Sequence, residues 1–256
     1  MSFASLTKGL VLAGGLLVAA NGAQAAGGEP YPSLDWSFQG VFGTYDRASV
    51  QRGFQVYKEV CSACHGMHYL AYRNLGEIGF SPEEVKAIAA EYEVEDGPDD
   101  FGDMFFRPAI PADTFREPFP NVEAARAANG GAYPPDLSLV AKRTPYGANF
   151  VYGTLTGYED EPPPGSDVTL APGQYYNKYK GAFSMAPVLF KGSVEYTDGT
   201  AATVHQMSYD VSNFMMWAAE PHMESRKQTG IKAILFLLVF TGILYAVKRK
   251  IWSKLH

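Results

Sequence analysis

The feature that most constrains this chain is the run Cys61-Ser62-Ala63-Cys64-His65. Two cysteines separated by two residues on a turn match the spacing of the two vinyl groups of haem, with which their sulfur atoms form thioether bonds. The histidine that follows then lies over the iron. The motif therefore predicts one haem c, attached through Cys61 and Cys64 and ligated on one side by His65.

Other sites built from paired cysteines fit the chain less well. These two are its only cysteines, so neither a disulfide framework nor a cysteine-rich zinc site is expected. A thioredoxin-like redox pair belongs in a βαβ setting, whereas here a predicted helix runs into the motif. Haem attachment is the interpretation that we retain.

The first 25 residues are typical of a cleaved signal peptide. Lys8 supplies a positive charge, residues 10–20 are apolar, and Ala23-Gln24-Ala25 is a small-residue cleavage pattern. The apolar run is too short to span a bilayer, and an uncleaved N-terminal anchor is the alternative. We expect the domain that follows to be exported to the periplasm.

A second apolar run predicts a membrane anchor. Residues 230–247 contain a single charge, Lys232, and approach the ~20 residues that a spanning helix needs. The basic tail, residues 248–256, places the C-terminus in the cytoplasm by the positive-inside rule. Residues 224–229 are predicted as a linker, and a buried core helix is the alternative to a span.

Residues 26–223 form the predicted haem domain. Local patterns predict a mainly α fold with long irregular loops, like that of cytochromes c, followed by one transmembrane helix. The expected helices cover residues 46–59, 122–128, 137–142 with Asp136 as N-cap, 148–156 and 204–218, and one more starts at Ser81-Pro82. Residues 93–120 and 161–181 are expected to be irregular, and Asp198-Gly199 to be a turn that ends a small hairpin.

One face of the first helix predicts how the domain is held together. Gly53 and Tyr57 lie four residues apart, and a glycine permits close approach by another helix. In small cytochromes c such a pair packs against aromatic residues of the last helix, here Phe214 and Trp217. Generic core packing is the alternative.

The second axial ligand decides the chemistry, because His/Met ligation suits electron transfer while an open position suits gas binding or peroxidase activity. Of eight methionines, Met104 and Met185 lie in predicted loops. Met185 precedes Ala186-Pro187 and is favoured on position, but position alone leaves Met104 open.

Charge is distributed unevenly. The total of −6 divides into −13 for residues 26–223, +6 from Glu224 onward and +1 from Lys8. Such an acidic domain argues against nucleic acid and favours a basic protein partner. The residues predicted to steer that partner are Glu91, Glu93, Glu95, Asp96, Asp99 and Asp100. A merely solvated surface is the alternative.

Several stretches together resemble the cytochrome c1 family, the haem subunits of the cytochrome bc1 complex. They include Arg52 to Lys58, Cys61 to His65, Ala71-Tyr72-Arg73, Asp96-Gly97-Pro98, Glu123 to Asn129, Pro134 to Ser138, Leu155 to Tyr158, Met185-Ala186-Pro187 and Trp217 to Pro221. The resemblance extends from about Trp36 over the remaining chain.

The resemblance implies several roles for residues of this chain. Met185 would be the sixth iron ligand, Arg143 the residue nearest a haem propionate, and Asn129 and Pro134 further contacts of the haem pocket. The fold implied is a haem domain on the periplasmic side of a bacterial inner membrane.

The function implied is transfer of single electrons from a Rieske iron-sulfur protein to a soluble cytochrome c, beside cytochrome b, with no enzyme activity of the subunit alone. One alternative is a membrane-tethered carrier that feeds a terminal oxidase without these partners. Such carriers have a shorter stretch between motif and methionine than the 120 positions from His65 to Met185. The other alternative is a haem enzyme such as a peroxidase.

Overall fold

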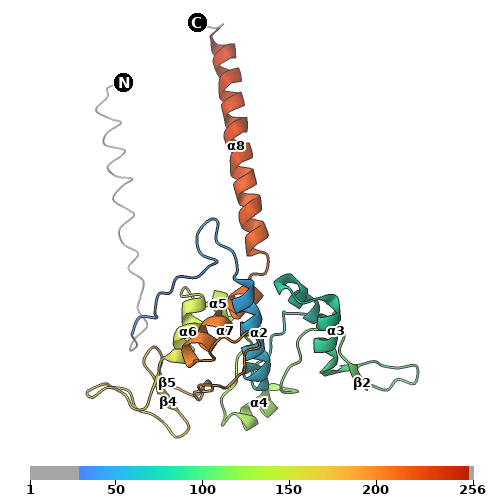
Figure 1. Cartoon of the computed structure of the whole chain (residues 1–256), viewed down its shortest axis with the longest axis vertical. Helices are drawn as coiled ribbons and strands as arrows, with labels where there is room; N and C mark the ends of the chain where they lie inside the picture. The colour runs from blue at the N-terminus through green and yellow to red at the C-terminus, as the bar shows by residue number, and fades with distance from the viewer. Residues whose placement is uncertain (1–28, 254–256) are drawn as a thin grey trace.

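The computed structural model describes residues 29–253, which form a helical body from which one long helix projects (Figure 1). The predicted signal peptide, residues 1–25, lies outside this range. The helices are α2 (Arg47–Glu59), α3 (Pro82–Ala90), α4 (Val122–Ala128), α5 (Val140–Arg143), α6 (Ala148–Thr156), α7 (Val204–Ala219) and α8 (Met223–Trp252), with 3₁₀ helices η1 (Cys61–Ala63) and η2 (Tyr72–Ile78). The predicted fold class, mainly helical with one C-terminal apolar helix, is confirmed.

Local capping explains why the helices start where the sequence predicts. The Asp46 side chain accepts hydrogen bonds from the Ala48 and Ser49 amides at the start of α2. Ser81 and Glu84 form a reciprocal capping box around Pro82 at the start of α3. The predicted bounds of α4 and α6 are also confirmed.

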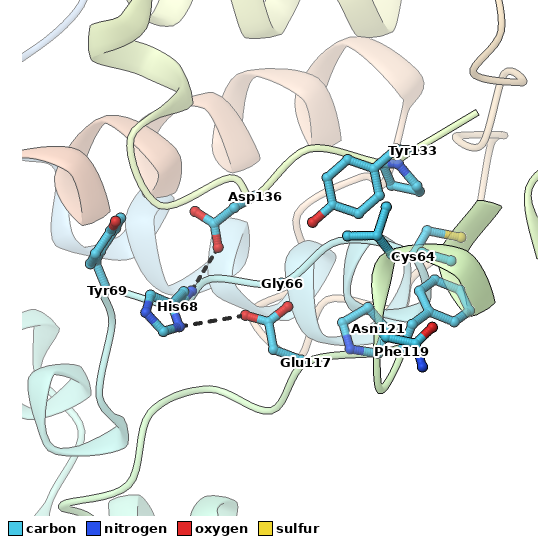
Figure 2. Close-up of a pocket in the computed structure, with 13 residues that line it drawn as sticks. Cys64, Gly66, His68, Tyr69, Glu117, Phe119, Asn121, Tyr133 and Asp136 are labelled. Carbon is cyan, nitrogen blue, oxygen red and sulfur yellow. Dashed lines mark hydrogen bonds and ion pairs between the residues drawn. The ribbon is translucent and has the colours of Figure 1, made fainter. Parts of the chain in front are cut away.

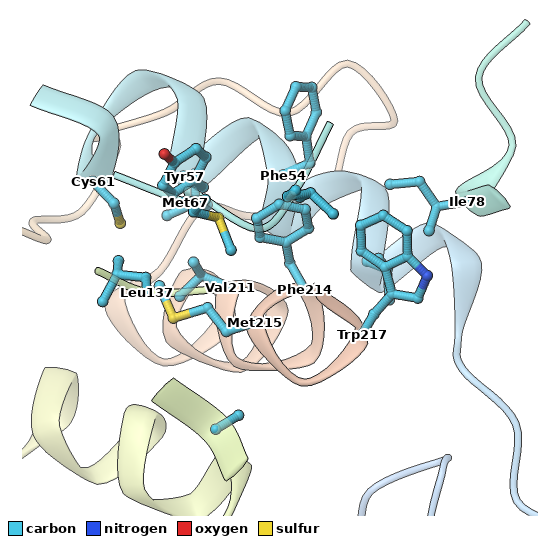
Figure 3. Close-up of a cluster of buried hydrophobic side chains, with 14 of the residues drawn as sticks. Phe54, Tyr57, Cys61, Met67, Ile78, Leu137, Val211, Phe214, Met215 and Trp217 are labelled. Atoms are coloured by element: carbon cyan, nitrogen blue, oxygen red, sulfur yellow. The ribbon is translucent and has the colours of Figure 1, made fainter. Parts of the chain in front are cut away.

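Helices α2 and α7 pack together more closely than any ordinary side chain would allow. A Cβ atom at Gly53 would overlap the backbone carbonyl of Asp210 and lie 2.8 Å from Phe214 Cβ. The rings of Tyr57 and Phe214 are 5.7 Å apart, and those of Phe214 and Trp217 are 5.8 Å apart. Figure 3 shows these side chains in one buried cluster. The glycine therefore sets the distance between the two helices.

A buried ion pair joins the same two helices. Arg52 of α2 donates to both carboxylate oxygens of Asp210 of α7, at 2.9 and 3.0 Å, and the Asp210 side chain has no exposed surface. Ser49 Oγ donates to Asp210 Oδ1 at 2.7 Å. Because both carboxylate oxygens of Asp210 accept hydrogen bonds, the charge is tolerated in the core.

Two small sheets were not predicted. Strands β1 (Glu93–Asp96) and β2 (Phe105–Pro108) pair antiparallel inside the segment 93–120 that was expected to be irregular. Strands β3 (Tyr158–Glu159), β4 (Tyr175–Asn177) and β5 (Gly181–Phe183) form a second sheet at the edge of the segment 161–181. Three of the four residues of β1 are acidic, which disfavours a strand, and only Val94 is β-branched.

Two further predictions were wrong in detail. Asp136 does not cap a helix over 137–142, because its carboxylate accepts from the Ser138 amide in a turn and α5 starts only at Val140. Asp198-Gly199 does form a turn, where the Thr200 amide donates to Asp198 Oδ1 at 2.9 Å, but it joins no strands.

The long C-terminal helix has the length and composition of a membrane span. Its most apolar 18-residue window has a mean hydropathy of 2.2. The stretch 224–229, predicted as a linker, forms the first turns of this same helix. Arg47 pairs with Glu224 at 2.7 Å, and Lys227 Nζ donates to the carbonyls of Phe38 and Gly43 at 2.6 and 3.0 Å. The helix is therefore attached to the helical body through side-chain contacts as well as through the chain.

Candidate functional site

The Cys-x-x-Cys-His run forms a tight turn at the end of α2. The amides of Cys64 and His65 both donate to the carbonyl of Cys61, at 3.1 and 2.9 Å. Cys61 is buried, and burial raises the pKa of its thiol to about 12. Redox-active and metal-binding cysteines instead have a lowered thiol pKa. The environment of Cys61 is therefore that of an apolar attachment point, and Figure 3 shows its sulfur directed toward Leu137.

His65 is oriented by a segment distant in the sequence. Its Nδ1 lies 2.7 Å from the carbonyl oxygen of Pro135. Because a carbonyl only accepts, Nδ1 carries the proton and Nε2 keeps a free electron pair. Burial lowers the pKa of the imidazole, which favours the neutral, ligating form. The Tyr57 hydroxyl donates to the His65 carbonyl at 3.1 Å, so Tyr57 holds the turn in addition to packing against α7.

The two candidate methionines lie in different surroundings. Met185 follows β5, is half-buried and packs against the hydrophobic core. Its carbonyl accepts a hydrogen bond from the Tyr158 hydroxyl at 2.9 Å. Met104 precedes β2 in the β1–β2 hairpin, its surface is 55% exposed, and Figure 1 shows that hairpin projecting from the helical body. Only Met185 therefore has a fixed, half-buried position of the kind that an iron ligand needs.

An open cavity of about 390 Å³ adjoins the attachment motif beside Cys64. Figure 2 shows a polar end, where the His68 amide donates to Asp136 Oδ2 at 2.7 Å and the His68 ring lies 4.0 Å from Glu117. The other end is apolar and aromatic, lined by Phe119, Val122, Ala125, Tyr133 and Pro134. The lining includes Cys64 but neither His65 nor Met185. The cavity therefore adjoins the site on the Cys64 side and does not contain the candidate iron ligands.

Two cations, Arg143 and Lys180, lie close enough for the charge of one to act on the other. Lys180 stands in the turn between β4 and β5, with Nζ 4.1 Å from the Phe150 ring and 4.9 Å from the Phe183 ring. Burial and the charge of Arg143 lower the Lys180 pKa. Within residues 29–253, neither cation has a carboxylate partner. The adjacent Thr144 Oγ1 is buried and also lacks a hydrogen-bond partner there.

The other predicted pocket residues divide between the cavity and a helix end. Pro134 lines the cavity beside Cys64. Asn129 caps the end of α4, where its amide nitrogen Nδ2 donates to the Ala125 carbonyl at 2.7 Å. Asn129 therefore has a role in the local fold that its sequence position alone did not indicate.

The six predicted steering acids all lie on or near the β1–β2 hairpin, but they are not equivalent. Glu91 pairs with Lys58 at 2.7 Å, and Asp96 pairs with Arg107. Asp99 accepts from the amides of Phe101 and Asp103 at 2.8 and 3.0 Å. Glu93, Glu95 and Asp100 are exposed, and the structure gives them no ion pair among the residues that it describes.

Sequence reasoning missed the groups that orient the site. The Pro135 carbonyl, the Tyr158 hydroxyl and the Lys180 ammonium act across the fold on residues far away in the chain. Pro135 and Tyr158 stand within stretches that match the family pattern, which was the one available signal. Their partners follow only from the tertiary structure.

Comparison with known proteins gives consistent relatives over almost the whole chain. The pattern of the Cytochrome C1 family matches residues 36–255. The chain is 47% identical to cytochrome c1 of Rhodospirillum rubrum over 97% of each protein, and 48% identical to a mitochondrial cytochrome c1 heme protein of Solanum tuberosum over 94% of this chain and 92% of that one. It is also 47% identical to "Cytochrome b/c1" of Bradyrhizobium diazoefficiens, over 99% of this chain but 40% of the relative's length.

Proposed function

Because the chain belongs to the cytochrome c1 family, whose members are haem subunits of the cytochrome bc1 complex, we propose that it carries single electrons from a Rieske iron-sulfur protein to a soluble cytochrome c. The observation that carries this proposal is the attachment turn. There, two cysteines stand at the spacing for haem, and the next residue, His65, is held neutral with Nε2 free.

The residues around that turn fit one covalently bound haem c. Cys61 and Cys64 would hold it through thioether bonds, and His65 Nε2 and the Met185 thioether would ligate the iron. When bound, the haem supplies one-electron chemistry at a potential that His/Met ligation raises. The protein would orient both ligands through Pro135 and Tyr158, and it buries Cys61, one of the two attachment points.

The cation pair supports the predicted propionate contact and extends it. Arg143 and Lys180 repel each other, and Lys180 is half-buried. Half-buried Lys180, exposed Arg143 and the Thr144 hydroxyl, which has no partner within residues 29–253, together match the negative charge and acceptor oxygens of a haem propionate. Arg143 and Lys180 together would therefore neutralise that group.

Membrane attachment and partners follow from the same family assignment. We propose that α8 crosses a bacterial inner membrane once beside cytochrome b, with the haem domain in the periplasm. The name of the Bradyrhizobium relative pairs cytochrome b with c1, and this chain spans only part of its length, which supports an arrangement with the two proteins in contact.

The junction between domain and anchor favours a fixed subunit over a tethered carrier. A carrier that moves between partners needs a flexible linker. Here α8 continues without a break from Met223, and Glu224 and Lys227 bind the domain directly. A stationary haem domain that receives electrons from a mobile donor suits this rigid attachment.

Two experiments test the proposal at different levels. Acid-acetone extraction should leave haem on the denatured polypeptide, whereas the double variant Cys61→Ala, Cys64→Ala should release it; free extraction from the native protein would refute covalent attachment. Purification in mild detergent should recover cytochrome b and the Rieske protein with this chain. If terminal-oxidase subunits were recovered in their place, the tethered-carrier function would be correct.

A further inference from the structure

An exposed apolar pair lies beside the start of the proposed anchor. Val41 and Phe42 are 62% and 84% exposed, although the aromatic residues on either side of them in the sequence, Phe38 and Tyr45, are buried and in ring contact at 5.6 Å. Isolated surface apolar residues need no explanation. An adjacent apolar pair at the tip of a loop that is fixed at both ends does need an explanation.

The loop of residues 38–43 is held in one conformation. The Thr44 amide donates to the Ser37 carbonyl at 3.1 Å, closing the base of the loop. Gly43 approaches the Gln39 carbonyl so closely that a Cβ atom would overlap it, and Gly40 has a φ of +72°. Because only glycine fits these two positions without strain, the backbone presents the tip residues in a defined direction.

Lys227 fixes this loop next to α8. Its Nζ donates to the carbonyls of Phe38 and Gly43, one on each side of the loop base. Figure 1 shows the loop, in blue, rising along the first turns of α8 on the side toward which that helix projects. The tip and the anchor therefore point the same way.

Elementary distances place the tip near the membrane boundary. From Lys227 to Ile231, where the apolar span begins, a helix rises roughly 6 Å. Val41 and Phe42 stand two and one residues from Gly43 at the loop base, so the chain carries them at most roughly 7 Å beyond that base. The polar region on each side of a bilayer is about 5–7 Å thick. Val41 and Phe42 thus lie within reach of the lipid headgroups.

We propose that Val41 and Phe42 insert into the membrane interface and form a second lipid contact that fixes the tilt of the haem domain on its anchor. This inference rests on the proposed membrane crossing of α8. Apolar side chains in contact with the headgroup boundary are favourable there. Two side chains are too few to anchor the domain alone, so the loop orients it and α8 retains it.

The experiment uses the full haem-loaded chain in vesicles of phosphatidylcholine and phosphatidylglycerol, without its partners. A nitroxide is attached to single variants Phe42→Cys, Phe101→Cys and Phe236→Cys, since Cys61 and Cys64 are occupied by haem. Phe101 is the matched control, because it is 91% exposed at the tip of the acidic hairpin. Phe236 of α8 reports the membrane core. Collision with oxygen, which concentrates in lipid, is compared with collision with a water-soluble nickel chelate.

The oxygen-to-nickel accessibility ratio at position 42 should exceed that at position 101 several-fold and stay below that at position 236, because the interface lies between water and the membrane core. A ratio at position 42 equal to that at 101 overturns the loop proposal while leaving the anchor intact. Shielding of position 42 from both reagents also overturns it, because protein and not lipid would cover the loop. A water-exposed position 236 would show that the anchor itself is wrong, and the loop contact would fall with it. Val41→Cys should repeat the result at position 42.

Discussion

The α2–α7 helix pair and the β1–β2 hairpin both contain aromatic and charged residues, but the helix pair buries them and the hairpin exposes them. In the helix pair, Phe54 and Tyr57 are buried in ring contact with Phe214, and an arginine binds an aspartate whose side chain has no exposed surface. In the hairpin, Phe101 and Phe106 are exposed, and Arg107 pairs with two aspartates at the surface. In the α2–α7 pair, aromatic and charged residues hold the helices together, whereas in the hairpin they face solvent.

The difference shows which region fixes the site and which is free to meet partners. The attachment turn follows directly from α2, and Tyr57 of α2 donates to the His65 carbonyl. Any movement of α2 against α7 would therefore move the attachment turn. Among the residues that the structure describes, no hydrogen bond, ion pair or ring contact joins the hairpin to His65 or Met185. Changes in the helix pair should alter stability and ligation, whereas changes in the hairpin should alter encounters alone.

The largest expected effect is on the haem potential, when each of the two loop methionines is replaced by leucine in turn. Met185→Leu should remove a soft ligand that favours ferrous iron and lower the haem potential markedly, because the half-buried position next to Tyr158 would then offer no sulfur. Met104→Leu, in the exposed hairpin, should leave the potential unchanged. Redox titration and the ligation spectrum measure both. A wild-type potential in Met185→Leu with a shifted one in Met104→Leu would reverse the assignment.

Next in size is the contrast between two arginines that each bind two carboxylates. Arg52→Ala leaves the buried Asp210 charge without its partner and should cost about 3–5 kcal/mol of unfolding free energy. Arg107→Ala removes only surface pairs with Asp96 and Asp113 and should cost at most about 1 kcal/mol. Denaturant unfolding of each variant measures the difference. Equal losses would mean that the hairpin contributes to the core in a way its exposure does not indicate.

A smaller effect is expected at the point where α2 and α7 touch. Gly53→Ala puts a Cβ atom against the Asp210 carbonyl and should cost about 1–3 kcal/mol through overpacking. Gly76→Ala is the control, because a Cβ atom there meets nothing within 4 Å. It should be neutral or slightly stabilising. The same unfolding measurement applies, and a neutral Gly53→Ala would show that the helices separate without loss.

The comparison of the helix pair with the hairpin also explains which elements could be predicted from the sequence. Helices α4, α6 and α7 were predictable because caps and apolar periodicity act within a few residues, and the attachment motif was predictable because its three chemical groups are contiguous. The hairpin was missed because Glu93 and Glu95 are poor strand formers, and because their partners in β2, Pro108 and Phe106, lie in a separate stretch of the chain.

The site likewise contains residues that local spacing predicts and groups that only folding brings near. Cys61, Cys64 and His65 follow from local spacing, and Met185 needed a resemblance to be chosen over Met104. The carbonyl of Pro135 and the charge of Lys180 act on groups brought near only by folding. No local pattern marks a backbone carbonyl as the group that will orient a histidine.

The smallest effect on the isolated protein, and the clearest on its encounters, is expected at the hairpin acids. Glu93, Glu95 and Asp100 have no ion pair within residues 29–253, so neutralising them to Gln, Gln and Asn should change stability by at most about 0.5 kcal/mol. The haem potential should also stay the same. Electron transfer to a basic cytochrome c at low salt should slow about two- to fivefold, because three charges of a long-range field are lost.

The salt dependence separates a local effect of the hairpin from net charge. Screening over ~8 Å at physiological salt should bring the native and neutralised proteins to the same rate as ionic strength rises. The matched control removes three exposed acids from scattered positions, as Asp35→Asn, Asp167→Asn and Glu195→Gln. Stopped-flow rates should depend less steeply on salt in the hairpin variant than in this control. Equal slopes in the two variants would assign steering to the whole domain charge, and slopes equal to that of the native protein would leave these acids a role in solubility alone.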